Sequence, residues 1–176
     1  MTANCPVHAL SYSAYGPDSS CVPHEGFVKL GGSTVWESAW CGSLPDYRGV
    51  NILKIDPFTC TLLESRTFDT HIAASYATYL TNYLDGLSDG DVVVGVTADE
   101  PRRRLHPALP TLSAWGVDVA DVGFRGSFAF VAQKGDASKT VMDKVPSNGI
   151  SAFAPAEVDV IVQGSLLTAH YNHSMN

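Results

Sequence analysis

The chain has 176 residues, of which 45% are hydrophobic, and this excludes a disordered protein and favours one globular domain over residues 1–176. Eleven Lys and Arg residues against 18 Asp and Glu residues give a formal net charge of −7. This balance argues against nucleic acid and against an anionic membrane surface as partners, because both are bound through a surplus of Lys and Arg. No apolar run is long enough to span a bilayer, so we expect no membrane insertion.

The first 25 residues are rich in Pro, Ser, Gly, Tyr and Cys and are predicted to form an irregular arm. The chain has four cysteines, which form no C-x-x-C pair, and this argues against a zinc site. Two disulfides in an oxidising compartment fit better, and they would tie the arm to the core, with three pairings open. The candidate cysteines are Cys5, Cys21, Cys41 and Cys60.

The next segments read as β-strands. Residues 26–40 predict two strands joined at Gly31 and Gly32, which is a hairpin signal. Residues 49–56 carry aliphatic side chains on both faces, as a central strand does, and residues 61–68 return as its neighbour.

An amphipathic helix is predicted next, capped by Asp69 or Thr70 and stopped at Asp89-Gly90. Its apolar positions recur at helical spacing, and the tyrosines among them are predicted to form its buried face. These apolar positions are Ile72, Tyr76, Tyr79, Leu80, Tyr83 and Leu87.

The second half continues with alternating short elements. We expect a buried strand over 92–98, a short helix near 108–115, and strands over 118–122, 127–133 and 158–164. The core then covers 26–164, and 165–176 form a loose tail. Because the strands pair like hairpins rather than βαβ units, the pattern predicts an α+β (α/β sandwich-like) domain with a mainly antiparallel sheet.

No catalytic motif is present. The sequence has no phosphate loop, dinucleotide-binding turn or G-x-S-x-G elbow, and its six histidines are scattered. Asp99 and Glu100 are adjacent carboxylates, but nothing singles out Asp56, Asp69 or Asp121 as the second group that glycosidase chemistry needs. We therefore expect no enzyme activity, no metal and no cofactor.

Four segments carry a resemblance to a known extracellular family. They are YRGVNILKIDPFTC at 47–60, RTFDT at 66–70, DGDVVVGVTADE at 89–100 and GFRGSFAFVAQKG at 123–135. In order and spacing they resemble the domain of the interleukin-like epithelial–mesenchymal transition inducer and the pancreatic-derived factor. Relatives occur in large extracellular hyaluronan-processing proteins and as the stem domain of the protein O-linked-mannose N-acetylglucosaminyltransferase. The resemblance implies two facing, mainly antiparallel sheets with flanking helices.

The family includes secreted signalling proteins, whereas the transferase stem domain binds β-linked N-acetylglucosamine and is not catalytic. Its sugar is held by an arginine in R-G-[IV]-[NH], an aspartate in x-D-E and an arginine in G-[WF]-R, which here match Arg48, Asp99 and Arg125. This chain departs from that relative in carrying Phe124 for tryptophan and Gly126 for aspartate. Cys60 also replaces a glycine usual in that turn.

Such residues suit a sugar, because a carboxylate accepts from vicinal hydroxyls and an arginine fork donates to them. Phe124, Trp36 and Trp40 are candidate platforms for the C–H face of the ring. The plainer interpretation is a structural ion pair between Asp99 and one of the two arginines. Similarly, Arg102-Arg103-Arg104 is either a solvated run or a contact for an anionic glycan.

The resemblance therefore predicts a secreted, metal-independent, lectin-like domain that binds glycans or glycoproteins carrying a β-linked hexosamine or galactose. We expect the N-acetylglucosamine or N-acetyllactosamine type. Homodimer formation would add avidity. The alternatives are a cytokine-like signal acting through a protein receptor and an accessory domain of a larger enzyme.

Overall fold

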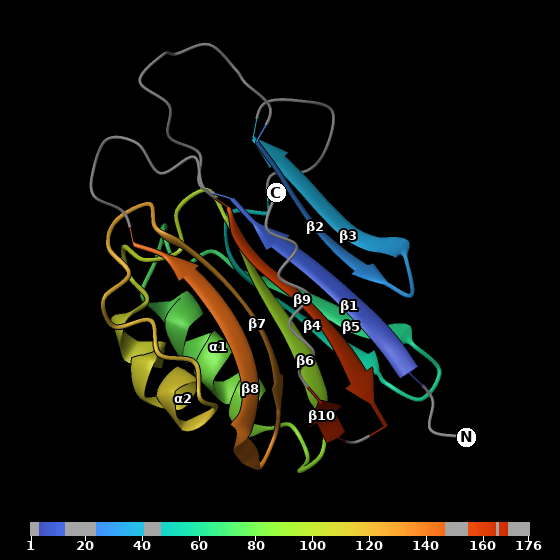
Figure 1. The fold of residues 1–176 in the computed structure, drawn as a ribbon. Coiled ribbons are helices and arrows are strands. Elements are labelled where there is room, and N and C mark those ends of the chain that lie inside the picture. Colours follow the sequence, from blue (N-terminus) through green and yellow to red (C-terminus); the bar gives the residue numbers. More distant parts are fainter. Residues whose placement is uncertain (1–3, 13–23, 41–46, 147–154, 165, 169–176) are drawn as a thin grey trace.

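Two antiparallel sheets of five strands each form the protein in a computed structural model, which describes residues 4–12, 24–40, 47–146, 155–164 and 166–168 (Figure 1). The first sheet contains, in spatial order, β10 (Leu166–Thr168), β9 (Ala156–Gln163), β1 (Asn4–Ser11), β2 (His24–Leu30) and β3 (Ser33–Trp40). The second contains β5 (Thr61–Phe68), β4 (Gly49–Asp56), β6 (Val92–Ala98), β7 (Ser127–Gln133) and β8 (Asp136–Val145). The predicted pair of antiparallel sheets is thus confirmed, although the fold is mostly β.

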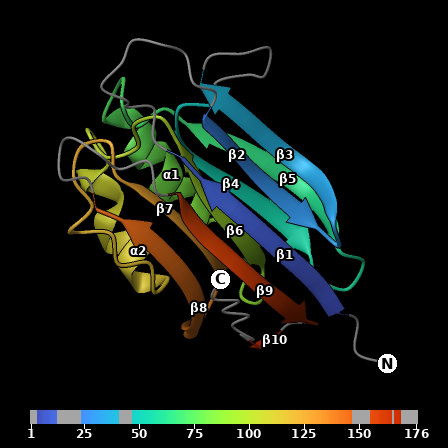
Figure 2. The same ribbon diagram turned by 45° about the horizontal axis from the view of Figure 1, so that its top comes forward.

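The sheets face each other and bury one core between them (Figure 2). Strand β1 alternates along its length, so that Cys5, Val7 and Ala9 point inward and are fully buried. Strands β6 and β7 are buried at every position, since both faces of the second sheet are covered. The continuous apolar run at 92–98 therefore forms the predicted buried strand.

Helices cover the outer face of the second sheet and enclose a second core (Figures 1 and 2). They are α1 (Ser75–Asp85), the 3-10 helix η1 (His106–Ala108) and α2 (Leu109–Ala114). The last two confirm the short helix predicted near 108–115. No helix of the described residues is long and apolar enough to cross a membrane.

The predicted buried face of the first helix is right for Leu80, Tyr83 and Leu87 but wrong for Ile72, Tyr76 and Tyr79. Helix α1 begins at Ser75 and buries Ala77, Leu80 and Leu84 against the second sheet. Tyr76 and Tyr79 stand on the exposed side, where 36% and 56% of their surfaces are accessible. The residues after Asp69 form turns rather than the first turn of this helix.

Four further predictions need correction. Residues 4–11 are not part of an irregular arm but form β1, the middle strand of the first sheet. Residues 118–122 form a turn and irregular backbone rather than a strand, because Val119 and Val122 pack into the helix-side core instead of pairing in a sheet. Strand β8, at the edge of the second sheet, was not predicted. Leu166–Thr168, which the sequence assigned to a loose tail, form β10 at the edge of the first sheet, and the tail beyond 168 lies outside the described residues.

One disulfide connects the two sheets. Cys5 of β1 is bonded to Cys60 in the turn between β4 and β5, with 5.1 Å between their Cα atoms. Cys60 has a φ of +55°, the left-handed conformation that favours glycine. This explains why a glycine suits that turn in proteins without the cysteine. Cys21 and Cys41, the other two candidates, lie outside the described residues.

Candidate functional site

The strand register brings the predicted site residues to one edge of the second sheet. Gly49 pairs with Ala98 across β4 and β6, so Arg48 and Asp99, one residue further on, occupy the same edge. Strand β7 begins at Ser127, two residues after Arg125, and runs antiparallel to β6. Adjacent strands lie about 4.8 Å apart, so Arg48 and Arg125 flank Asp99 across about 10 Å.

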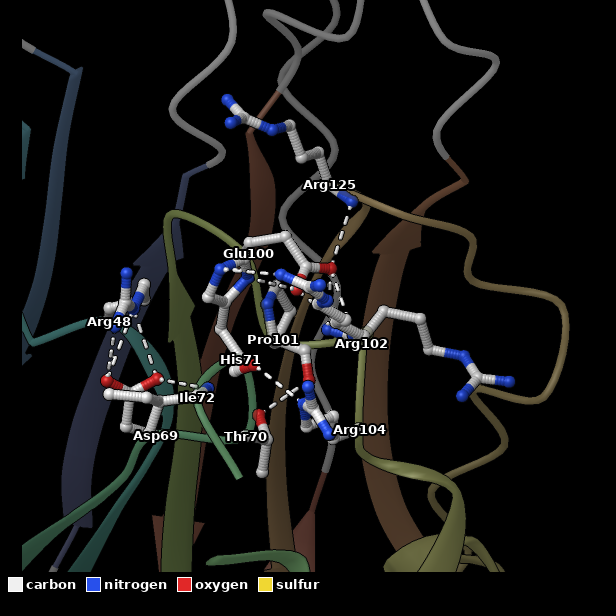
Figure 3. Close-up of polar contacts among 11 residues, drawn as sticks. Arg48, Asp69, Thr70, His71, Ile72, Glu100, Pro101, Arg102, Arg104 and Arg125 are labelled. Atoms are coloured by element: carbon white, nitrogen blue, oxygen red, sulfur yellow. Dashed lines mark hydrogen bonds and ion pairs between the residues drawn. The ribbon is translucent and has the colours of Figure 1, made fainter. Parts of the chain in front are cut away.

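We call this edge the rim and define it as Arg48, residues 69–72, residues 99–104 and residues 123–125 (Figure 3). Gly49 permits its construction. The glycine has a φ of +106°, and a Cβ atom there would lie 2.1 Å from the carbonyl oxygen of Phe68. The R-G dipeptide is therefore required for β4 to pass so close to the end of β5.

Arg48 forms a two-pronged ion pair with Asp69. Its Nη2 lies 2.8 Å from Asp69 Oδ2, and its Nε lies 3.1 and 3.2 Å from the two carboxylate oxygens. The backbone N–H of Ile72 donates to Asp69 Oδ1 as well, at 3.2 Å. About 30% of the Arg48 side chain is exposed, so its guanidinium is both fixed and open to solvent.

Glu100 is the buried centre of the rim, with 1% of its surface accessible. Its carboxylate accepts the backbone N–H groups of Arg102 (3.0 Å), Arg103 (3.0 and 3.1 Å) and Arg125 (3.2 Å). His71 Nδ1 lies 3.1 Å from Oε2. One carboxylate thus joins three rim segments, a role that could not be predicted from the sequence beyond its place beside Asp99.

Two of the predicted site residues have strained backbones. Only three non-glycine residues in the described part of the chain have positive φ, and Asp99 (+56°) and Arg125 (+60°) are two of them, with Cys60 the third. A bulky residue rarely adopts this conformation. Such strain is found where surrounding structure imposes it, and it clusters at binding and catalytic sites.

Phe124 provides an exposed aromatic surface at the rim. It is 54% accessible, and the guanidinium carbon of Arg125 lies 5.4 Å from the centre of its ring. Asp99 is only 5% accessible. Of the other candidate platforms, Trp36 is 7% accessible and packs between the sheets, whereas the side chain of Trp40 lies outside the described part.

The rim has the opposite charge to the whole chain. It holds five of the eleven Lys and Arg residues, against three carboxylates, whereas the chain has a net charge of −7. Arg103 and Arg104 are exposed, and Arg104 Nε donates to the carbonyl of His71 at 3.2 Å. Arg102 is turned inward, because its Nε donates to the carbonyl of Val122 at 2.7 Å. The arginine run is therefore partly structural and partly available to an anion.

Gly126 explains one departure from the glycan-binding relative. A Cβ atom at this position would lie 2.5 Å from Val122 Cγ1 and 2.9 Å from the carbonyl oxygen of Val145. The aspartate found there in the relative would not fit this packing.

The described residues contain no group of three His, Cys, Asp or Glu side chains arranged to hold a metal ion. Metal-independent binding stays a prediction.

Comparison with known proteins identifies a family. The family model described as interleukin-like EMT inducer matches residues 48–136, which is half of the chain. The matched segment runs from Arg48 to Asp136 and therefore contains every residue of the rim.

Two curated proteins are similar over most of this chain. The human cell migration-inducing and hyaluronan-binding protein is 30% identical over 142 residues, which cover 80% of this chain. Its mouse counterpart is 29% identical over 152 residues, which cover 85% of this chain. In both, the matched region is about 10% of the relative's length, so this chain is similar to one small part of each.

Proposed function

The chain belongs to the interleukin-like EMT inducer family, and from this premise we propose that it binds glycans containing a β-linked hexosamine, of the N-acetylglucosamine or N-acetyllactosamine type, through the rim. The observation that carries the proposal is the common sheet edge of Arg48, Asp99 and Arg125, three residues far apart in the sequence. Domains of this family are extracellular in general, and we propose a secreted lectin-like role.

The chemistry of the rim suits a sugar ring. The ion pair with Asp69 holds Arg48 in place, and the side chain is still partly exposed. It can therefore donate to ring hydroxyls without a further loss of side-chain conformational entropy. Phe124 offers an exposed apolar face beside Arg125. Charged groups form stronger hydrogen bonds with hydroxyls than neutral groups do, so a few contacts give selectivity at a shallow site.

The excess of arginine favours a glycan that also carries carboxylates. Exposed Arg103 and Arg104 lie beside His71 at the rim and can attract an anionic chain. The name of the human relative states that it binds hyaluronan. We therefore include acidic hexosamine-containing polysaccharides in the proposed ligand class.

A glycan array followed by titration of a bound oligosaccharide tests the proposal. Asp99→Asn removes the charge and suits the left-handed backbone, because asparagine adopts it readily. We expect Asp99→Asn and Arg125→Gln each to weaken binding about tenfold or more, as the loss of a charged hydrogen bond predicts. Arg66→Gln is the matched control, since this exposed arginine on β5 lies outside the rim.

Unchanged binding by both rim variants would reject the rim as the site. An array on which the wild-type protein binds no glycan would reject the proposed function. Melting temperatures within a few degrees of wild type establish that lost binding does not reflect unfolding.

A protein receptor is the second candidate. It is favoured by two exposed apolar side chains, Ile72 in the rim and Tyr79 on α1, which are 58% and 56% accessible. Under this alternative, Ile72→Ser with Tyr79→Ser would abolish receptor capture, whereas Asp99→Asn would leave it intact.

A further inference from the structure

A groove lies between the two sheets, on the side where β3 and β5 are the edge strands. It has a volume of about 520 Å³ and is lined by Thr34, Val35, Trp36, Glu37, Tyr47, Ser65 and Thr67. Strands β3 and β5 are the last strands of their sheets and lie near each other on the same side of the sandwich (Figure 2). A volume of this size falls within the range of small-ligand sites.

The lining combines aromatic rings with hydroxyl groups. The rings of Trp36 and Tyr47 lie 5.8 Å apart, and Thr34, Ser65 and Thr67 add hydroxyls. Trp36 Nε1 is buried and donates to no acceptor in the described part of the chain. Buried donors are normally paired.

Among the described residues that line the groove, the only charged side chain is the carboxylate of Glu37. A carboxylate accepts hydrogen bonds from hydroxyls and repels other carboxylates. The groove therefore selects an uncharged ligand with hydroxyls and an apolar face, which is the chemistry of a neutral pyranose.

Residues that line the groove are close in sequence to residues of the rim. Tyr47 lines the groove and Arg48, the next residue, belongs to the rim, while Thr67 lies two residues before Asp69. Asn51 fixes this junction, because its Nδ2 donates to the carbonyl of Tyr47 at 2.8 Å and its Oδ1 accepts from Thr67 Oγ1 at 2.7 Å. In sheet order the groove lies beyond β4, on the side of Arg48 away from Arg125.

We propose that this groove is a further subsite, which holds an uncharged sugar residue of the same glycan that the rim binds. The inference rests on the proposed function and deepens it. The sheet edge from β5 to β7 spans three strand intervals, or about 14 Å, which exceeds the width of one sugar ring. The protein then recognises several consecutive residues of a chain rather than its terminal sugar alone.

A peptide strand added to the open edge of β3 or β5 is the competing occupant. Strand addition uses pockets for alternate side chains along one edge. The lining instead comes from both sheets and from Tyr47, and its hydroxyls face a single volume. This arrangement favours a compact polyhydroxyl ring.

Uncharged β-linked N-acetylglucosamine oligomers of increasing length test the subsite by calorimetric titration. For the wild type we expect the affinity to rise about tenfold from the monosaccharide to longer oligomers. A sugar residue in the groove adds hydrogen bonds, and a gain of about 1.4 kcal/mol corresponds to a tenfold change in affinity. Ser65→Phe fills the groove from an exposed position and should remove this gain while leaving monosaccharide affinity unchanged. Thr61→Phe, four residues earlier on β5 and outside the lining, should keep the gain.

The subsite would be overturned if affinity did not depend on oligomer length, or if Ser65→Phe kept the gain in affinity with length. Rim variants that still weaken binding would show that the proposed function stands in that case. If no oligomer of any length binds to the wild type, the proposed function itself fails. Displacement of a bound oligomer from the groove by an extended peptide, with loss of peptide binding in Ser65→Phe, would assign the groove to strand addition instead.

Discussion

The disulfide between Cys5 and Cys60 joins the middle strand of one sheet to a turn of the other. The two cysteines are 55 residues apart in the sequence, so the bond closes a long loop. Cys60 has the left-handed backbone conformation that favours glycine. The residue therefore forms the cross-link and also carries the free-energy cost of a positive φ.

Two double variants separate these effects. Cys5→Ala with Cys60→Ala should lower the free energy of unfolding by about 2–4 kcal/mol, because the unfolded chain loses its constraint. Cys5→Ala with Cys60→Gly should be about 1 kcal/mol more stable than the alanine pair, since glycine adopts positive φ without strain. Denaturant titration under identical conditions measures both. Equal stability of the two double variants would show that residue 60 is not strained.

Removal of the Glu100 carboxylate should disorder the rim. Glu100→Ala leaves the backbone N–H groups of Arg102, Arg103 and Arg125 without their acceptor, and we expect a loss of about 2–4 kcal/mol in stability. Glu157→Ala is the control, because its exposed pair with His8 should contribute less than about 1 kcal/mol.

Glycan affinity of Glu100→Gln distinguishes a positioning role from a purely structural one. This variant keeps the shape of the side chain, so it should stay folded at room temperature. Its amide has one acceptor oxygen instead of two, so it should lose some of the hydrogen bonds to the backbone N–H groups of the rim. We expect a weaker affinity with an unchanged ligand preference. If thermally stable Glu100→Gln bound sugar like the wild type, the positioning role would be excluded.

Burial of the side chain and, after it, the nearby Glu64 carboxylate together raise the pKa of Tyr83 from 10.0 to about 12. An unfolded tyrosine ionises near pH 10, whereas the folded one keeps its proton up to about pH 12. Between these values the unfolded state binds fewer protons, so the free energy of unfolding should fall as pH rises. The contribution is fully present below pH 10.

Tyr83→Phe should therefore lose less stability than the wild type between pH 9 and pH 12. Tyr79→Phe, which alters an exposed tyrosine of the same helix, should follow the wild-type profile. Urea titrations across this range provide the comparison. Parallel profiles for the wild type and Tyr83→Phe would contradict the role of burial at this residue.

The sequence predicted strands best where the β-branched run was long. The strands at 49–56, 61–68, 92–98 and 127–133 were all located, because their composition and their turns agree. Strand β8 was missed because it is an edge strand in which most residues are polar. Val141 is the only residue of this strand that is buried. Local composition does not reveal such a strand, since its pairing with β7 is a tertiary contact.

Helical spacing was less decisive. It correctly grouped Tyr76 and Tyr79 on one side of α1, but it did not show which side faces the sheet. The stripe that packs is formed by Ala77, Leu80 and Leu84, at spacings of three and four, and it shares only Leu80 with the predicted stripe. The small alanine lets the helix approach closely. Packing against the sheet, rather than the number of large apolar residues, chose between the two stripes.

For the site, the family resemblance picked out Arg48, Asp99 and Arg125, which the strand register places at one sheet edge, but it did not predict how that edge is organised. The partnership of Arg48 with Asp69 depends on a turn that replaced the predicted start of the helix. The role of Glu100 depends on backbone N–H groups from two separate loops. Such contacts carry no residue-type signal, because any residue can supply a backbone donor.

The exposed arginines should give binding a charge dependence that the rest of the rim does not. Arg103→Gln with Arg104→Gln removes two cations that are open to solvent, and it leaves Arg48, Asp99 and Arg125 in place. We expect affinity for an acidic, uronate-containing oligosaccharide to fall about fivefold to tenfold, since the local attraction to carboxylates is lost. Affinity for an uncharged N-acetylglucosamine oligomer should change less than about twofold.

Salt provides the independent measurement. Raising the ionic strength to about 1 M shortens the screening length to about 3 Å, so wild-type affinity for the acidic oligosaccharide should fall towards that of the double variant. Arg66→Gln, whose arginine lies on β5 outside the rim, should behave like the wild type with both ligands. If the double variant weakened acidic and uncharged oligosaccharides equally, Arg103 and Arg104 would be supporting the rim structure, and the acidic class of ligands would have to be abandoned.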